Sequence, residues 1–385
     1  MHKDDYQKNS ELILDSQYQR SLRSTDKFEH KRVLFIGSES YDAPTITLIQ
    51  GLSSLGFEIH TIRKQNINSF FVAKVITEPD PQSYDFVLSN LHWGTRWSLY
   101  SEYGLHACLK VLVDGDDNHR EHNWQQKIER YKRRYVCAPP DEIKDMQLAP
   151  YRWLEDCGNY KPDIVFECQK MNGNGTIYLP FGIHQEYLDL DERLNWKERD
   201  IDIAHIPGPG IWRKITKVVL RAGSATSLLK QYRIFNEPVY GDILTPQPIS
   251  DYISRDANVH SYHRWSVSLN YFRVLNRSRL LVYPNISRFP FWDSKRPWEA
   301  YAVGCAVLMK RPCIDTSRYP PEGIESTLVY KDERHLLGAL KQLFRDEEKC
   351  RVICERAVAR ARKYFSARAI ARYFLMQVYE QYQAS

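Results

Sequence analysis

Arg296 and Glu299 lie at a predicted helix start, in the segment SKRPWEAYA. Pro297 suits the first position of a helix, where its missing N–H donor costs no hydrogen bond. The main-chain N–H groups of a helix start attract phosphate, and Arg296 together with Lys295 carries the positive charge that balances a diphosphate. A carboxylate such as that of Glu299 can accept hydrogen bonds from the hydroxyls of a ribose. The segment therefore predicts a nucleotide-binding helix start, and the alternative is a carboxylate that only stabilises its own helix.

A second phosphate-binding pattern occupies residues 205–214, HIPGPGIWRK. Gly208 and Gly210 allow the backbone to approach a phosphate closely, because glycine has no side chain. Arg213 and Lys214 follow at the start of another predicted helix. The pattern predicts a loop that binds the same diphosphate, although a plain tight turn explains the two glycines equally well.

Candidate bases follow a predicted strand in the first half of the chain. Asp114 and Asp116 come directly after the apolar run KVLV, and His119 comes shortly after them. Ligands of open α/β sheets gather at the carboxyl ends of the strands, so one of these groups, or His92, is expected to deprotonate an acceptor hydroxyl. The two acids also fit a divalent-cation site or a turn that caps the next helix.

Residues 287–312, SRFPFWDSKRPWEAYAVGCAVLMKRP, resemble the donor-site segment of GT-B glycosyltransferases, especially the group related to spore-maturation-protein glycosyltransferases. In that segment an arginine precedes a helix that bears a glutamate, and a glycine and a strand follow. Here these positions are Arg296, Glu299, Gly304 and residues 306–309. The resemblance implies transfer of a sugar from a nucleoside diphosphate sugar to a hydroxyl, with a catalytic role for Arg296. It also implies that no catalytic metal and no cofactor other than this co-substrate is needed.

The resemblance extends to two shorter features. Arg213 and Lys214 correspond to the basic side chains that family members place against the donor diphosphate. Tyr240 lies in a segment that corresponds to the one that contacts the nucleotide base in family members. One position departs from the pattern, because Phe291 stands where many retaining members carry an acid. Whether the anomeric configuration of the transferred sugar is retained or inverted therefore stays open. A nonenzymatic binding protein with the same fold stays an alternative.

Short apolar runs alternate with helix-forming segments in both halves of the chain, which is typical of doubly wound parallel sheets. We therefore expect an α/β protein with two Rossmann-like domains that face a cleft, the GT-B arrangement. The expected organisation is a flexible N-terminal arm or loosely docked helix over 1–30, an acceptor domain over 31–195 and a nucleotide-sugar domain over 196–365. Residues 366–385 are expected to form a helix that crosses back to the first domain.

Length and composition limit the class of protein. The 385 residues suffice for two domains, and 43% hydrophobic and 26% charged residues are ordinary globular values. The formal net charge of +6 favours an anionic partner, which includes phosphate, a membrane surface contacted peripherally and nucleic acid. A DNA-base glycosyltransferase is therefore an alternative function. We expect a cytoplasmic protein, because no apolar run is long enough to span a bilayer, the N-terminus lacks the apolar core of a signal peptide, and the 8 cysteines lack zinc-site spacing.

Overall fold

The computed structural model describes residues 15–37, 43–62, 73–90, 98–114, 161–168, 176–183, 188, 193–206, 211–236, 269–283, 295–310, 329–330 and 332–384. The chain divides into two compact units. Unit 1 comprises Met1–Gln185, Arg288–Asp293 and Tyr364–Ser385, and unit 2 comprises Glu186–Ser287 and Ser294–Lys363.

Unit 1 contains a seven-stranded parallel sheet with the order β3-β2-β1-β4-β5-β6-β7. Its strands are β1 (Arg32–Ile36), β2 (Glu58–Thr61), β3 (Lys74–Val75), β4 (Phe86–Asn90), β5 (Lys110–Asp114), β6 (Ile164–Glu167) and β7 (Ile177–Tyr178). The strand order reverses between β1 and β4, so their following loops leave the sheet in opposite directions. This is the strand order of a Rossmann-like sheet, as predicted.

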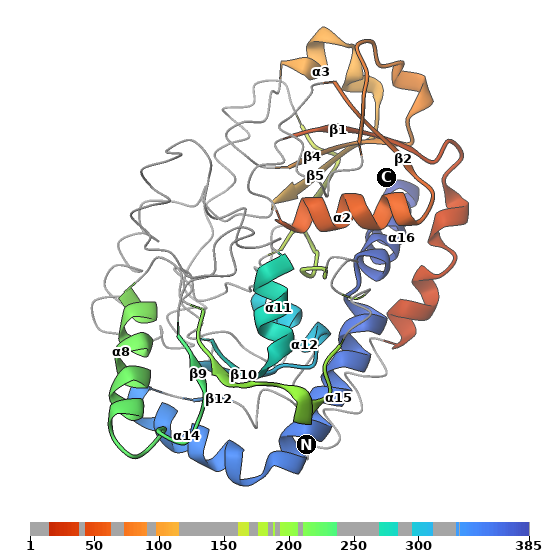
Figure 1. Ribbon diagram of the computed structural model, residues 1–385. Coiled ribbons are helices and arrows are strands. Elements are labelled where there is room, and N and C mark those ends of the chain that lie inside the picture. The colour runs from red at the N-terminus through yellow and green to blue at the C-terminus, as the bar shows by residue number, and fades with distance from the viewer. Residues whose placement is uncertain are drawn as a thin grey trace, which may run out of the picture. The chain divides into compact units, whose positions relative to one another are not determined.

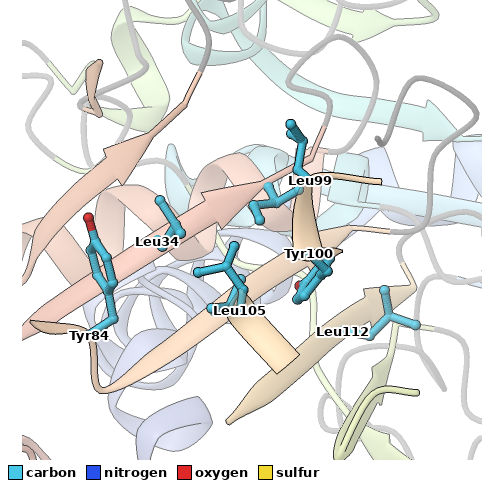
Figure 2. Close-up of a cluster of buried hydrophobic side chains, with 8 residues drawn as sticks. Leu34, Tyr84, Leu99, Tyr100, Leu105 and Leu112 are labelled. Carbon is cyan, nitrogen blue, oxygen red and sulfur yellow. The ribbon is translucent and has the colours of Figure 1, made fainter. Parts of the chain in front are cut away.

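One face of this sheet carries a cluster of buried side chains below two short helices, α3 (Leu99–Glu102) and η3 (Leu105–Ala107). Figure 2 shows Leu34 and Leu112 from the strands together with Tyr84, Leu99, Tyr100 and Leu105, and the cluster also includes Ile36 and Val87. The hydroxyl of Tyr100 lies 2.6 Å from the Oγ of Ser89. This hydrogen bond offsets the cost of removing the two hydroxyls from water.

The opposite face is covered by α2 (Ala43–Ser54) and α16 (Ala367–Ala384), which lie side by side (Figure 1). The ring of Phe374 on α16 packs against Phe86 and Phe166 of the sheet, with centroid distances of 5.8 and 4.6 Å. Because all three rings are fully buried, the final helix belongs to the core of unit 1.

The N-terminal segment also packs on the C-terminal part of unit 1. Residues 15–21 are helical, and η1 (Ser24–Lys27) follows. The hydroxyl of Tyr364 donates to Asp15 over 2.6 Å, and the hydroxyl of Ser24 donates to the carbonyl of Arg372 over 3.0 Å. From residue 15 onward the segment is therefore a docked helix with specific hydrogen bonds.

Gly51 allows α2 to lie very close to the start of α16. A Cβ at this position would lie 2.1 Å from the carbonyl oxygen of Ala367 and 2.7 Å from the Cβ of Ala371. Gly51→Ala is therefore expected to lower the free energy of unfolding by about 2–3 kcal/mol, because main-chain atoms cannot move aside cheaply. Gly338→Ala is the control, since that helical glycine has nothing within 4 Å of the added Cβ. Urea unfolding should show the control unchanged or more stable by about 0.5–1 kcal/mol, and equal stability of Gly51→Ala and the native protein would contradict the tight contact.

The carboxylate of Glu58 on β2 lies next to two basic side chains. It lies 2.9 Å from Nε2 of His60 and 3.1 Å from Nε of Arg32. The hydrogen bond from His60, followed by that from Arg32, lowers the pKa of Glu58 below its usual 4.5. A lowered folded-state pKa stabilises the protein above the unfolded-state value, and this contribution is lost as the pH falls through the folded-state value.

Glu58→Gln is therefore expected to reduce the free energy of unfolding by about 0.5 kcal/mol at neutral pH, a small effect because the carboxylate is 42% exposed. The difference from the native protein should shrink as the pH falls below 4.5. Urea unfolding over an acidic pH series measures it, and a difference that grows toward acidic pH would show that the sign is wrong.

Unit 2 contains a five-stranded parallel sheet with the order β12-β11-β10-β8-β9. Its strands are β8 (Ile201–Ala204), β9 (Ile234–Phe235), β10 (Ser278–Tyr283), β11 (Ala306–Lys310) and β12 (Val329–Tyr330). Its helices are η4 (Trp196–Glu198), α8 (Ile211–Ala225), α11 (Leu269–Arg277), α12 (Lys295–Ala302), α14 (Glu333–Arg345) and α15 (Glu347–Tyr364), the last residue of which falls in unit 1. The packing of α8 with α14 and of α11 with α12 fits helices on two faces of a doubly wound sheet.

Candidate functional site

The strand order of unit 2 reverses between β8 and β10, which are hydrogen-bonded neighbours. From β8 the chain continues through α8 to β9 at one edge of the sheet, and from β10 it continues through α12 to β11 on the other side. Ligands of open α/β sheets bind at such a switch point, outside the carboxyl ends of the strands. The starts of α8 and α12, where both phosphate-binding patterns were predicted, therefore follow the two strands on either side of this switch point.

Arg296 connects the start of α12 to the end of β8. Its guanidinium is half-buried, and Nη1 donates a long hydrogen bond of 3.5 Å to the carbonyl of Ile206. This contact joins residues that are 90 positions apart in the chain. It places a permanently charged guanidinium at the switch point, which suits binding of a diphosphate.

Glu299 lies in the first turns of the same helix and is only 1% exposed. Its neighbours Trp298 and Ala300 are also buried. Burial of a carboxylate is costly, so a buried Glu at this position must serve a specific interaction. Contact with a ribose stays a prediction for this side chain.

Helix α12 begins at Lys295, so Pro297 is its third residue and not its first as predicted. Proline is tolerated here because no N–H group of the first turn has an acceptor within the helix. The helix ends before Gly304, whose φ of 73° lies in the left-handed region that favours glycine. Gly304, expected from the family pattern, thus allows the sharp turn from α12 into β11.

A hydrogen-bonded pair of polar residues at the ends of β8 and β9 was not predicted from the sequence. His205, directly after β8, is fully buried, and its Nδ1 lies 2.9 Å from Oδ1 of Asn236. Asn236 directly follows β9. The sequence feature that could have indicated this pair is the histidine that directly follows a predicted strand.

Several predicted residues are described by their main chain alone. Lys295 is the first residue of α12, Arg213 and Lys214 lie in the first turn of α8, and Asp114 is the last residue of β5. These positions agree with the predicted helix starts and strand end. The remaining predicted site residues lie outside the described residues, and they are His92, Asp116, His119, Gly208, Gly210 and Tyr240.

Unit 1 has polar residues at its own switch point, between β1 and β4. Asn90 ends β4 and is fully buried, and its Oδ1 would lie 2.2 Å from a Cβ added to Gly37, which directly follows β1. The β5–β6 register pairs Asp114 with Glu167, which is 2% exposed. Asn90 and Glu167 were not predicted as site residues, and each is the last residue of its strand.

The buried thiols of unit 2 do not suit nucleophilic chemistry. Burial raises the pKa of Cys305 to about 12, that of Cys350 to about 11, and that of Cys354 well above its usual value. These thiols are therefore protonated at neutral pH.

Within the described ranges, no three His, Cys, Asp or Glu side chains gather in a group that suits a metal ion. Among the helices that the structure describes, none combines the length and apolar character that crossing a bilayer requires.

Comparison with known proteins agrees with this fold. Residues 227–376 match the glycosyl transferase-like family, whereas no curated protein shows significant sequence similarity to the chain. A glycosyltransferase from Rickettsia africae is 10% identical, with a TM-score of 0.53 over 92% of this chain and 99% of that one. Anabaena HepE in complex with UDP-glucose is 11% identical, with a TM-score of 0.50 over 92% of this chain and 100% of that one.

An α-glucosyltransferase in complex with UDP-glucose and DNA containing an abasic site is 9% identical, with a TM-score of 0.53 over 90% of this chain and 99% of that one. At such low identity these similarities establish the fold. The chain is thus a GT-B fold protein whose residues 227–376 match the glycosyl transferase-like family.

Proposed function

We propose that the protein transfers a sugar from a nucleoside diphosphate sugar to a hydroxyl group of an acceptor. The observation that carries this proposal is the position of Arg296, which is held at the carboxyl end of β8 at the switch point of unit 2. Arg296 also lies within the segment that matches the glycosyl transferase-like family. Two of the structural neighbours bind UDP-glucose, so UDP-sugars are the first donors to test.

The proposed donor site is built on unit 2. The positive charge of Arg296 and Arg213 balances the diphosphate, and Glu299 orients the ribose. The other residues assigned to the donor are Gly208, Gly210 and Lys214 of the loop and helix start after β8, Lys295 at the start of α12, and Tyr240 toward the base.

In the proposed reaction, the acceptor oxygen attacks the anomeric carbon of the donor sugar. The new carbon–oxygen bond forms as the bond to the β-phosphate breaks, and the negative charge passes to the nucleoside diphosphate beside Arg296. A base of unit 1, for which Asp114, Asp116 and His119 are the candidates, takes the proton of the acceptor. The proposed reaction needs no metal and no further cofactor, and we assign the protein to the spore-maturation-protein-like group of glycosyltransferases as part of this proposal.

A DNA-base glycosyltransferase is the second candidate function. The α-glucosyltransferase with the same fold was solved with DNA, and the net charge of +6 favours a polyanion. This function predicts DNA binding whose affinity falls steeply with salt.

The main proposal instead expects a cytoplasmic enzyme that acts on a glycan, a lipid or a small molecule, with peripheral membrane contact when the acceptor is a lipid. A GT-B-like protein that binds a ligand without turnover would show donor binding but no transfer.

A thermal-shift screen of nucleotide sugars tests the proposed function. A donor present at about 100 times its Kd should stabilise the native protein by about 2.7 kcal/mol, which raises the melting temperature by a few degrees. Glu299→Ala should abolish the shift for the same donor while the protein stays folded. If no UDP-, GDP-, ADP-, CDP- or dTDP-sugar stabilises the native protein, the proposed function is wrong.

A further inference from the structure

His205 is tied to the end of β9 by its main chain and by its side chain. Its main-chain N–H donates to the carbonyl of Phe235 over 2.8 Å, and its Nδ1 lies 2.9 Å from Oδ1 of Asn236. The imidazole is fully buried and Asn236 is partly buried, so water competes less for these hydrogen bonds than at the surface. The residue is therefore held in one orientation at the carboxyl end of β8.

The environment of Asn236 determines which imidazole nitrogen carries the proton. The amide Nδ2 of Asn236 donates to the carbonyl of Lys217 on α8 over 3.3 Å. A carbonyl only accepts hydrogen bonds, so the amide nitrogen must face Lys217 and the amide oxygen must face His205. Nδ1 of His205 therefore carries a proton and donates it to Asn236.

The next residue, Ile206, receives the Nη1 hydrogen bond of Arg296 on its carbonyl. A continuous path of hydrogen bonds and main chain thus runs from Lys217 through Asn236, His205 and Ile206 to Arg296. The path crosses the switch point of the sheet and connects α8 with α12. His205 therefore links the end of β9 to the peptide group that contacts the guanidinium.

We infer that His205 and Asn236 are positioning residues for Arg296 in the donor site, an inference that rests on the proposed function. His205 is fully buried and Asn236 is partly buried, and they bond to each other at the carboxyl ends of β8 and β9. They set the direction of the Ile206 carbonyl, and this carbonyl sets the guanidinium against the diphosphate. Misplacement of a binding group by a fraction of an ångström weakens the interaction without removing the group itself.

A double-mutant cycle with UDP as the ligand tests this inference. Asn236→Ala is expected to weaken UDP binding about tenfold in isothermal titration calorimetry, because residues of one hydrogen-bonded path couple energetically. In the Arg296→Ala background the same substitution should have no further effect on UDP affinity. Nitrogen-15 NMR of the native protein should show the Nδ1-protonated form of His205, and Asn236→Ala should remove this preference.

Asn276→Ala is the matched control. Asn276 is a buried asparagine of unit 2, whereas Asn236 is partly buried, and the side chain of Asn276 accepts a hydrogen bond of 3.1 Å from the main chain of Leu194, near the start of β10. It should lower the melting temperature as much as Asn236→Ala and leave UDP affinity unchanged. Additive effects of Asn236→Ala and Arg296→Ala on UDP affinity, or unchanged UDP affinity in Asn236→Ala, would overturn the inference. If the native protein binds none of UDP, GDP, ADP, CDP and dTDP, the proposed function fails, and that outcome is distinct from additivity.

Discussion

Replacement of Arg296 with alanine is expected to lower kcat/KM for the nucleotide sugar by about 10²–10³-fold, the effect of removing one group that stabilises developing charge in a buried site. The charge on the diphosphate increases as its bond to the sugar breaks, so the guanidinium should stabilise the transition state more than the bound donor. The effect should therefore fall on kcat as well as on KM. Initial rates with a fixed acceptor and varied donor measure both parameters.

Arg296→Lys separates charge from geometry. Lysine keeps the positive charge but lacks the planar fork that binds phosphate oxygens in pairs, so its activity should lie between those of the native and alanine proteins. Arg277→Ala is the control, because Arg277 is an exposed arginine of unit 2 that pairs with Asp200 near the amino ends of the strands. Activity of Arg296→Ala within about twofold of this control would remove Arg296 from the proposed mechanism.

Arg199→Ala is expected to lower the free energy of unfolding by about 4 kcal/mol, comparable to breaking a buried ionic interaction. The residue is 3% exposed. Nη1 donates to the carbonyl of Ser278 over 2.6 Å, and Nη2 donates to the carbonyls of Val303 and Leu194 over 2.6 and 3.2 Å. Removal of the guanidinium leaves these buried carbonyls without a strong donor, at the start of β10 and directly after α12. Burial lowers the pKa of Arg199, although an arginine remains charged at neutral pH.

Urea unfolding measures the effect of Arg199→Ala, and Arg277→Ala again serves as the control. The ion pair of Arg277 with Asp200 is exposed, so its loss should cost less than about 1 kcal/mol. Arg199→Lys should remain destabilised, because one ammonium group cannot reach carbonyls from three segments. A value for Arg199→Ala close to that of the Arg277 control would mean that the hydrogen bonds to the carbonyls contribute little.

The amino-acid sequence by itself predicted the longer strands of both sheets and, to within two residues, the starts of α8 and α12. It did not predict the two-residue strands β3, β9 and β12. Strands of a parallel sheet are buried on both faces, so residues such as 33–36 and 280–283 form uninterrupted apolar runs that can be recognised without a structure. The position of Arg296 at a helix start was also predictable, because Pro297 marks the first turn of a helix. Local patterns therefore determined the fold class and the main candidate of the donor site.

Tertiary structure decided which of these elements are neighbours. The placement of β8 beside β10 brings Ile206 to Arg296, and the placement of β9 on the other side of β8 brings Asn236 to His205. No local pattern encodes strand order, because it results from packing of the whole sheet and its two helical layers. The burial of Glu299 and the role of Arg199 likewise depend on contacts between distant segments, which only the folded chain creates.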